Sequence, residues 1–244
     1  MSSKLSVSLI LPAYNEVKTI AQVIQEAKDY FERRGGAYEI LVCADGNDGT
    51  RELAEKMAKS NSHLKVTGHP GRCGKGRGIR EGMKMAQGEI IGFSDADNKT
   101  PIDEFEKMEP WLTEGYEMVI GSRALQDSRI LRAQPLHRRL GSVGFSLFMH
   151  AVLGMREIVD TQCGFKFFKR HAALDLFSRQ RIDGYMFDPE ILYLAHLLGY
   201  SIKQVPVRWK DDGDSRFHCL SGGIRDAIDI FRIRFNHPRL KSST

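Results

Sequence analysis

The 244-residue sequence has no apolar run that approaches the roughly 20 residues needed to cross a bilayer. Its N-terminus leads straight into a strand-like segment, without the longer apolar stretch of a signal peptide. Cysteine is scarce and scattered, with no Cys-x-x-Cys pair and no nearby His at zinc-finger spacing, which argues against a zinc module or a disulfide framework. We therefore expect a protein that starts out soluble and intracellular, with reduced thiols in its core.

Internal repeats, low-complexity segments and a clear linker are also lacking. The 41% of hydrophobic and 27% of charged residues are an ordinary globular composition, and the length suffices for a substantial core. Two small domains would fit the length as well, but nothing marks a boundary between them. We predict a single domain over residues 1–244 with a specialised second half.

Positive charge is unevenly distributed along the chain, although the net charge is only +5. Residues 65–84 contain six basic residues and one acidic residue, and residues 121–150 contain five basic residues and one acidic residue. A local excess of this kind indicates an anionic partner, whereas any single arginine could simply face solvent. A diphosphate, a lipid phosphate, a membrane surface or a nucleic acid would satisfy it.

Strand-like and helix-like segments alternate through the first half of the sequence. The predicted strands cover residues 5–11, 38–44, 64–68 and 88–94, and helices at about 20–31, 51–60 and 75–87 separate them. This alternation is typical of βαβ units and predicts an α/β fold with a mostly parallel, Rossmann-like sheet flanked by helices. Because ligands bind outside the carboxyl ends of such strands, the loops after the first, second and fourth strands should share one edge.

The second half is predicted to be less regular. Thr100 and Pro101 form a good helix start, and that helix should run to about residue 113. Further elements are expected as strands at 116–121, 160–168 and 201–209, a loop at 124–134, and helices at 135–154, 184–199 and 221–235. The amphipathic stretches 140–152 and 224–235 suit either a core or, with their flanking arginines, an anionic membrane interface.

Asp95 and Asp97 end the most apolar of the predicted strands, with one small residue between them. Once the chain turns out of the sheet, both carboxylates can converge on one ligand, and paired acids suit a divalent cation that carries a diphosphate. The pattern itself is common, since Asp212 and Asp214 also match it. Its position at the end of a buried strand is what makes it informative.

The Gly-rich stretch 71–78 is neither a phosphate-binding P-loop nor a dinucleotide fingerprint. Lys75 is followed by Gly76 where a P-loop has Ser or Thr, and the glycine order of the dinucleotide fingerprint is missing. What remains is a basic loop at a helix N-terminus, a place that favours an anion. Lys75 and Arg77 are therefore candidates for binding a donor phosphate, with a solvated loop as the alternative.

Eight short motifs follow one another in a fixed order along nearly the whole chain. They are Pro12-Ala13-Tyr14-Asn15-Glu16, Asp45-Gly46 before Asp48-Gly49-Thr50, Gly74-Lys75-Gly76, Asp95-Ala96-Asp97, Gly121-Ser122-Arg123, Asp160-Thr161-Gln162-Cys163-Gly164-Phe165-Lys166, Phe187-Asp188-Pro189-Glu190 and Val205-Pro206-Val207-Arg208-Trp209. In this order they resemble the family-2 inverting glycosyltransferases of GT-A fold, and among them the dolichyl-phosphate glucose and mannose synthases, the glucose type most closely.

The resemblance implies a nucleotide-sugar-binding half at 1–121 and an acceptor half with amphipathic helices at 122–244. In the implied site Asp95 touches the ribose and sugar, and Asp97, with Asp95 beside it, holds Mg²⁺ or Mn²⁺. The residues implied to bind the donor are Pro12, Ala13, Tyr14, Glu16, Asp45, Lys75, Asp95, Ala96, Lys210 and Arg216. Those implied to hold the phosphate of a polyprenyl acceptor are Arg123, Arg138, Arg139 and Ser142.

Two residues depart from the family pattern. Ala44 stands where the family usually has the first of two adjacent acids, which leaves the choice between UDP and GDP open. Lys99 stands where the mannose-type enzymes often have a metal-binding Gln, and a protonated lysine cannot ligate a metal. Either the metal site has fewer protein ligands, or the cation is held chiefly by Asp97, donor phosphates and water.

The acceptor decides whether the reaction needs a general base. Asp97 with its cation, aided by a lysine or arginine, would stabilise the leaving diphosphate. A lipid phosphate is already largely ionised at neutral pH and needs no base, whereas a sugar hydroxyl would need one. Asp188 or Asp183 would be the candidate base, although Asp188-Pro189 also fits a plain helix start. The catalytic candidates are thus Asp95, Asp97 and Asp188.

The sequence therefore predicts a metal-assisted inverting hexosyltransferase, with UDP-glucose as the favoured donor and a polyprenyl phosphate as acceptor. It would act as a peripheral protein at the cytoplasmic face of a membrane, and a homodimer is compatible with it. A relative with a soluble or sugar-hydroxyl acceptor is the nearest alternative. A sugar-nucleotide pyrophosphorylase would need a Gly-rich turn after the first strand, and a nucleic-acid-binding protein would need aromatic residues among its basic ones.

Overall fold

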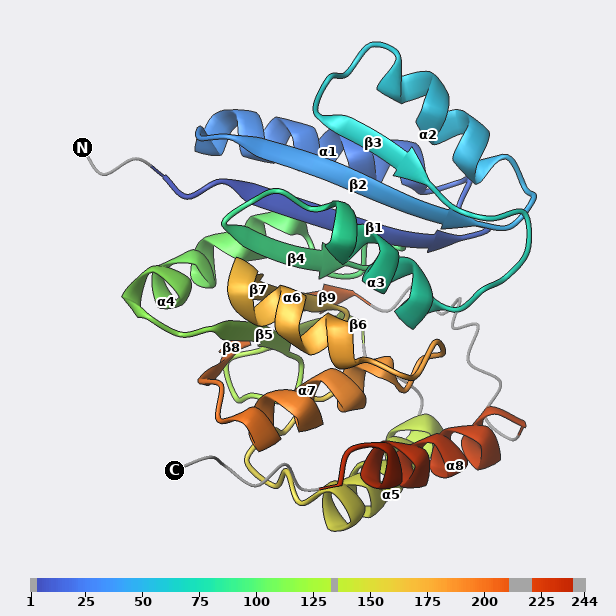
Figure 1. Cartoon of the computed structure of the whole chain (residues 1–244), viewed down its shortest axis with the longest axis vertical. Coiled ribbons are helices and arrows are strands. Elements are labelled where there is room, and N and C mark those ends of the chain that lie inside the picture. The colour runs from blue at the N-terminus through green and yellow to red at the C-terminus, as the bar shows by residue number, and fades with distance from the viewer. Residues whose placement is uncertain (1–3, 133–135, 211–220, 239–244) are drawn as a thin grey trace.

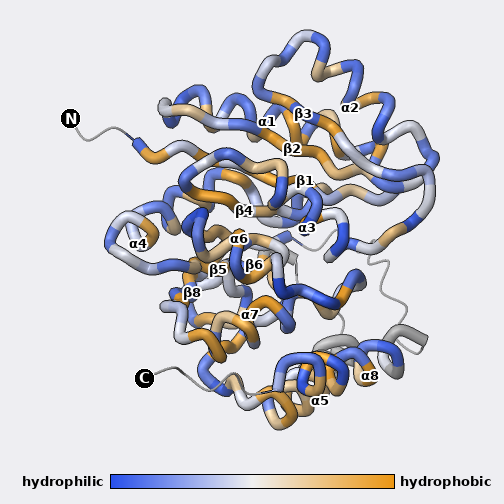
Figure 2. The backbone as a smooth tube through the Cα atoms, in the orientation of Figure 1, coloured by the Kyte–Doolittle hydropathy of each residue, from blue (hydrophilic) through white to orange (hydrophobic). Residues whose placement is uncertain are grey.

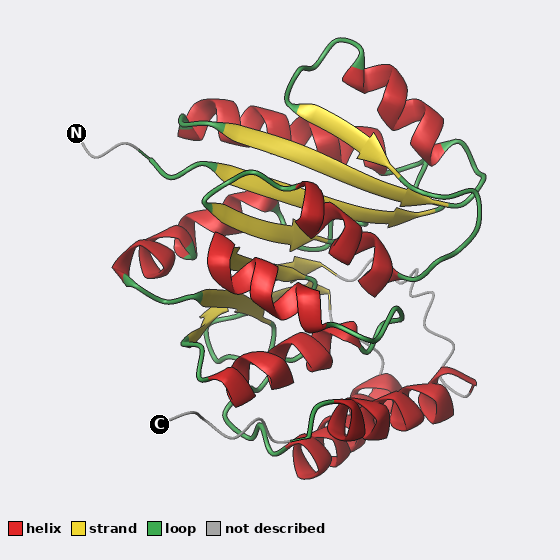
Figure 3. Ribbon diagram, viewed as in Figure 1, coloured by secondary structure: helices red, strands yellow, loops and turns green. Residues whose placement is uncertain are grey.

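A seven-stranded sheet runs through the protein, with the strand order β3-β2-β1-β4-β7-β5-β8. The computed structural model describes residues 4–132, 136–210 and 221–238. Figures 1 and 3 show the sheet between layers of helices. Its strands are β1 (Val7–Tyr14), β2 (Tyr38–Asp45), β3 (Leu64–Thr67), β4 (Ile90–Ser94), β5 (Met118–Ser122), β7 (Phe165–Lys169) and β8 (Ile202–Pro206).

Six of these strands run in one direction and β7 runs against them. β1 pairs in parallel with β2 and β4, β2 with β3, and β5 with β8, whereas β7 is antiparallel to both β4 and β5. The predicted mostly parallel sheet is therefore confirmed. Because β7 is reversed, the loop that leads into it lies at the same edge as the loops that leave β1, β2 and β4, and Ser94 at the end of β4 pairs with Phe165.

The strands bury side chains on both faces, which is why they are apolar almost throughout. Leu9 and Leu11 of β1 join one hydrophobic core and Ile10 joins the other, because alternate residues of a strand point to opposite faces. Each such fully buried side chain contributes roughly 2 kcal/mol relative to an exposed one. The first core is covered by α1 (Ile20–Arg34), α2 (Thr50–Ala58), η1 (Ile102–Lys107) and α4 (Glu109–Glu114), and the second by α3 (Lys75–Met85), α6 (Arg170–Arg179) and α7 (Phe187–Leu198).

The helix predicted from Thr100 to about residue 113 is wrong as a single element. Pro101 is the N-cap of the 3₁₀ helix η1, and an α-helix begins again only at Glu109. Pro110 explains the division, since proline is tolerated in the first turn of a helix but breaks its interior. Thr100 is therefore not the cap residue.

Other corrections concern the second half of the chain. The predicted loop at 124–134 contains β6 (Arg129–Arg132), which pairs with β9 (Arg208–Lys210) in a separate two-stranded sheet. The predicted strand at 201–209 divides into β8 and β9 around Val207. The strand predicted at 160–168 begins only at Phe165, and the helix predicted at 184–199 begins only at Phe187. The helix α6 was not predicted.

The two predicted amphipathic helices are confirmed as α5 (Leu136–Leu153) and α8 (Ser221–Asn236). They pack together at the end of the molecule away from β3, with the rings of Phe148 and Phe231 5.7 Å apart (Figure 1). Met149 and Ile233 are buried there, so part of each helix belongs to the core. The hydropathy colouring of Figure 2 shows hydrophobic residues along both helices.

Among the described side chains of α5 and α8, four large apolar ones are exposed, and we call them the outer strip. They are Leu147, Ile228, Phe231 and Phe235, of which Phe235 is 78% exposed. Arg225 and Arg232 of α8 are exposed as well. Within the described ranges no helix combines the length and the apolar character that a membrane span requires.

Candidate active site

The carboxyl edge of the sheet brings together the ends of β1, β2 and β4, as a parallel sheet requires. Tyr14 and Asp45 are register partners at the ends of β1 and β2, and Asp95 follows β4 directly. Pro12 and Ala13 are the two residues of β1 directly before Tyr14. The residues predicted to bind the donor thus come from adjacent strands, and Lys75 joins them from the first residue of α3.

Asp95 is held in place from two sides. Its carboxylate Oδ1 lies 2.6 Å from Nζ of Lys75, and its backbone N–H donates to the carbonyl of Gly164 at 3.0 Å. A Cβ atom on Gly164 would lie 2.0 Å from Oδ2 of Asp95. Only glycine at position 164 therefore leaves room for this carboxylate.

Asp97 is paired with the lysine that departs from the family pattern. Nζ of Lys99 lies 3.1 Å from Oδ2 of Asp97, and the backbone N–H of Lys99 donates to Oδ1 at 3.2 Å. Burial raises the pKa of Asp97, the nearby Asp95 adds to this, and Lys99 opposes both. Lys99 is itself fixed by Lys210 of β9, whose backbone N–H donates to its carbonyl at 3.0 Å.

Asp188 lies beneath the site. It is 3% exposed, and its carboxylate forms an ion pair with Lys166 of β7 through Oδ1 and lies 3.9 Å from Nζ of Lys75 through Oδ2. Burial raises the pKa of Asp188 more than the two lysines lower it. Asp188 is in the first turn of α7 and is not its N-cap, which is Met186. A carboxylate so enclosed and paired is poorly placed to take a proton from an acceptor.

Arg123 is tied to Asp160 by two side-chain hydrogen bonds. Its Nε and Nη2 donate to Oδ2 and Oδ1 at 2.8 and 2.9 Å, and its backbone N–H also donates to Oδ2. Its guanidinium lies 5.5 Å from the ring centroid of Trp209. The predicted acceptor arginine is therefore held rigidly by two elements of the second half.

The remaining acceptor and donor candidates are placed only in part. Arg138, Arg139 and Ser142 belong to α5, but their side chains are outside the described part of the structure. Arg216 lies outside the described residues altogether, and Lys210 is exposed at the end of β9. Glu16 lies in the turn after β1, where its backbone N–H donates to the hydroxyl of Thr50 at 2.8 Å.

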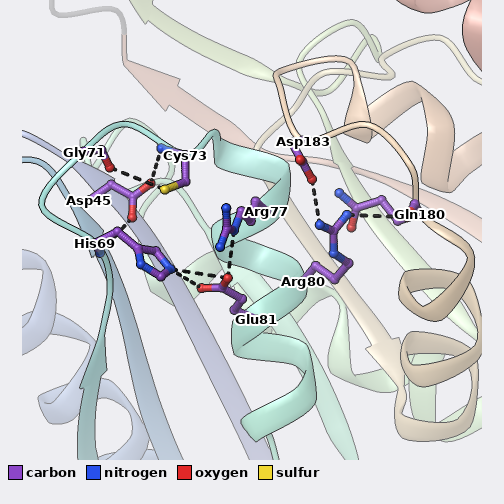
Figure 4. A network of polar contacts seen from close by, with 9 residues as sticks. All are labelled: Asp45, His69, Gly71, Cys73, Arg77, Arg80, Glu81, Gln180 and Asp183. Carbon is purple, nitrogen blue, oxygen red and sulfur yellow. Dashed lines mark hydrogen bonds and ion pairs between the residues drawn. The ribbon is translucent and has the colours of Figure 1, made fainter.

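Asp45 organises the basic loop that precedes α3 (Figure 4). Its carboxylate accepts hydrogen bonds from the backbone N–H groups of His69 and Cys73 at 3.2 and 2.9 Å. Nε of Arg77 donates to Glu81 at 2.9 Å, and Glu81 also contacts His69. Of the two donor-phosphate candidates, Arg77 is therefore engaged on the flank of α3, whereas Lys75 contacts Asp95.

Several residues at the site were not singled out by sequence reasoning. The guanidinium of Arg72 lies 4.9 Å from the ring centroid of Tyr14 and 5.7 Å from that of Tyr185, so it bridges the two halves of the molecule. Asp160, Gly164 and Lys166 were only parts of a motif. The signal for these three was the motif itself, but its contacts depend on the reversed direction of β7.

The paired aspartates fit a divalent cation that arrives with a diphosphate. The side chains of Asp95 and Asp97 are 35% and 28% exposed, and carboxylate oxygens are the ligands that Mg²⁺ and Mn²⁺ accept. Across the described residues, no group of three or more His, Cys, Asp or Glu side chains could hold a metal by itself. The protein thus offers one or two carboxylates and leaves the other ligands to phosphate and water, as is common for Mg²⁺.

The sheet with two aspartates and basic side chains at its carboxyl edge defines the class of GT-A glycosyltransferases. Among solved structures, glucosyl-3-phosphoglycerate synthase from Mycobacterium tuberculosis, in complex with Mn²⁺, UDP and glucosyl-3-phosphoglycerate, matches with a TM-score of 0.69 at 24% identity, over 94% of this chain and 80% of that chain. Mannosyl-3-phosphoglycerate synthase from Rubrobacter xylanophilus matches with a TM-score of 0.70 at 19% identity, over 98% of this chain and 77% of that chain. At these identities the likeness shows the fold.

Sequence comparison gives the family. Residues 8–177 match Glycosyl transferase family 2. A dolichyl-phosphate beta-glucosyltransferase of Trichomonas vaginalis is 37% identical over 243 residues, which span 95% of this chain and 71% of that protein. The Homo sapiens dolichyl-phosphate beta-glucosyltransferase is 31% identical over 245 residues, 94% of this chain and 75% of that protein. The chain belongs to glycosyl transferase family 2, together with these glucosyltransferases.

Proposed function

We propose that this protein transfers glucose from UDP-glucose to a polyprenyl phosphate, with inversion at the anomeric carbon. The observation that carries the proposal is the 37% identity to a dolichyl-phosphate beta-glucosyltransferase, because it extends over 95% of the chain and so over both the donor and the acceptor half. The paired aspartates with Lys75 beside them supply a site for the donor's diphosphate.

In this proposal different residues at the carboxyl edge of the sheet bind different parts of the nucleotide-sugar donor. Pro12, Ala13, Tyr14, Glu16 and Asp45 hold the base and ribose. Asp95 and Ala96 lie against the ribose and sugar, and Asp97 is the chief protein ligand of the cation. When bound, Mg²⁺ or Mn²⁺ supplies positive charge against the diphosphate as it leaves. Lys75 adds a second positive charge there, and Lys210 and Arg216 close over the donor.

The acceptor phosphate attacks the anomeric carbon without a general base, since it is already largely ionised at neutral pH. The phosphate is bound by Arg123, Arg138, Arg139 and Ser142. The burial of Asp188 and its ion pair with Lys166 argue against Asp188 as the base that a sugar-hydroxyl acceptor would need.

The outer strip provides the contact with the membrane in which a polyprenyl phosphate resides. Leu147, Phe231 and Phe235 would lie among the lipid headgroups, and exposed arginines of α8 such as Arg232 suit the anionic cytoplasmic leaflet. Replacing Phe231 and Phe235 with serine should reduce sedimentation with anionic vesicles while transfer to a short, water-soluble polyprenyl phosphate continues. Equal sedimentation of the variant and the unmodified protein would remove the outer strip from this role.

The proposed activity is tested by incubating the protein with Mn²⁺ and radiolabelled UDP-glucose or GDP-mannose, with and without a short polyprenyl phosphate, and extracting the lipid. We expect label in the lipid from UDP-glucose only. Label from GDP-mannose would correct the donor, and no lipid label from either donor would contradict the proposal. Arg138→Ala should weaken acceptor use more than UDP binding, and an equal loss of both would place this residue outside the acceptor site.

A further inference from the structure

The motif from Asp160 to Lys166 has no role in the proposed reaction so far, although three of its residues contact residues of the site. Asp160 holds Arg123, Gly164 leaves room for the carboxylate of Asp95, and Lys166 pairs with Asp188. The motif occupies the loop that leads into β7 and the start of that strand, which the reversal of β7 brings to the carboxyl edge.

Four charged side chains from four elements form a chain in this region, with alternating sign. Lys166 of β7 contacts Oδ1 of Asp188, Oδ2 of Asp188 lies 3.9 Å from Nζ of Lys75, and Nζ of Lys75 lies 2.6 Å from Oδ1 of Asp95. Burial increases from one end to the other. The side chain of Asp95 is 35% exposed, that of Lys75 18%, that of Asp188 5% and that of Lys166 0%.

Lys166 is fixed at the inner end of this chain. Its ammonium also donates to the backbone carbonyl of Thr161 at 3.0 Å and lies 5.7 Å from the ring centroid of Phe93. A buried ammonium and a buried carboxylate stabilise each other only as a pair, because either alone would be left without solvent or a partner. Lys166 is therefore the principal counter-ion of Asp188, since Lys75 lies farther from that carboxylate.

The consequence concerns Lys75, which lies between two carboxylates. Its contact with Asp95 is close and its approach to Asp188 is 3.9 Å, so its ammonium is directed outward to the donor site. If Asp188 had no other cation, it would draw the ammonium of Lys75 inward, since an uncompensated buried carboxylate attracts the nearest positive charge strongly.

We propose that Lys166 is a positioning residue: by occupying Asp188 it keeps Lys75 directed at the donor's diphosphate. This role rests on the proposed function, because it assumes that Lys75 binds that diphosphate. In it Asp188 is a counter-ion for two lysines, and it takes no proton from the acceptor.

The test compares UDP with UMP, since only UDP carries the second phosphate that Lys75 is proposed to bind. Affinities are measured by isothermal titration calorimetry at about pH 8, well above the ordinary pKa range of carboxylates, and at one fixed Mn²⁺ concentration. For Lys166→Met we expect the preference for UDP over UMP to fall roughly tenfold, the effect of losing one charged hydrogen bond. Combining Lys166→Met with Lys75→Met should cause no further fall beyond that of Lys75→Met alone.

A second variant guards against loss of folding and tests the charge balance directly. Lys166→Met combined with Asp188→Asn removes both buried charges, so it should fold well and restore the preference for UDP. As a control, Lys107→Met removes the lysine that lies 2.6 Å from the buried carboxylate of Glu104, away from the site. It should leave the preference for UDP unchanged.

The outcomes separate this inference from the proposed function. An unmodified protein that binds no UDP and transfers no sugar would overturn both. If the unmodified protein binds UDP and transfers glucose, but Lys166→Met weakens UDP and UMP equally, then Lys166 is only structural and the inference fails. The inference also fails if the double variant with Asp188→Asn folds and does not recover its preference for UDP.

Discussion

Replacing Gly164 with alanine should inactivate the protein while leaving it folded. The added Cβ would lie 2.0 Å from Oδ2 and 2.3 Å from Cγ of Asp95, whereas ordinary contact begins near 3.4 Å. The carboxylate must therefore move by roughly 1.4 Å. A misplacement of about 1 Å in a catalytic group lowers rates about a hundredfold, so we expect kcat/KM for the donor to fall by roughly that factor, or about 2.7 kcal/mol.

The variant should still fold, because the displaced carboxylate of Asp95 can move into solvent. Its side chain is 35% exposed and can turn toward solvent. Glucosyl transfer is measured by lipid extraction, and folding is checked by circular dichroism and thermal unfolding. Gly223→Ala is the control, because a Cβ at that position meets nothing within 4 Å. A folded Gly164→Ala protein with unchanged kcat/KM would refute the reasoning that Asp95 must keep its present position.

Three further variants test the charges of the site. Asp97→Ala should lower transfer at least roughly a hundredfold without loss of folding; a rate like that of the unmodified protein would remove Asp97 from the cation site. The Lys99→Met variant should bind free Mn²⁺ more tightly in electron paramagnetic resonance titrations, because no ammonium group then neutralises Asp97. Unchanged or weaker binding would show that Lys99 does not compete with the cation. Burial alone would raise the pKa of Asp160, but Arg123 lowers this pKa below its ordinary value. The ionised carboxylate of Asp160 therefore stabilises the fold above about pH 4, its ordinary pKa. This contribution is lost as the pH falls through the lower pKa of the folded state. Asp160→Asn should therefore cost roughly 3 kcal/mol near pH 7 and progressively less at acidic pH in thermal unfolding; a difference that does not depend on pH would contradict this.

Much of the first half followed from local sequence patterns. The apolar strands ending at Tyr14, Asp45 and Ser94 each carry their polar residues at the carboxyl end, and the rule for parallel sheets places these ends together. Asp45 and Asp95 were thus expected at one edge. Lys75, predicted only as a candidate for binding a donor phosphate, forms an ion pair with Asp95 there. These predictions succeeded because strand periodicity and turn chemistry act over a few residues.

The second half was harder to predict because its elements depend on distant partners. β6 is only four residues long and exists through its pairing with β9, in which Arg129 pairs with Arg208 far along the chain. The division of the helix after Thr100 depended on Pro110, whose effect the sequence reasoning overlooked. The roles assigned to Arg138, Arg139 and Ser142 remain predictions, since their side chains are not described.

Local patterns in the chain were enough to select Asp95 and Asp97 for a cation with a diphosphate and Lys75 for an anion, because the aspartates follow a buried strand and the lysine begins a helix. How these charges are balanced depends on contacts between distant parts of the fold. Because β7 is reversed, Gly164 lies next to the carboxylate of Asp95 and Lys166 forms an ion pair with Asp188. The turn after Asp97 places Lys99 in an ion pair with the carboxylate of Asp97. The physical reason is that a hydrogen-bond partner or counter-ion is chosen by distance in space, which a local pattern in the chain does not record.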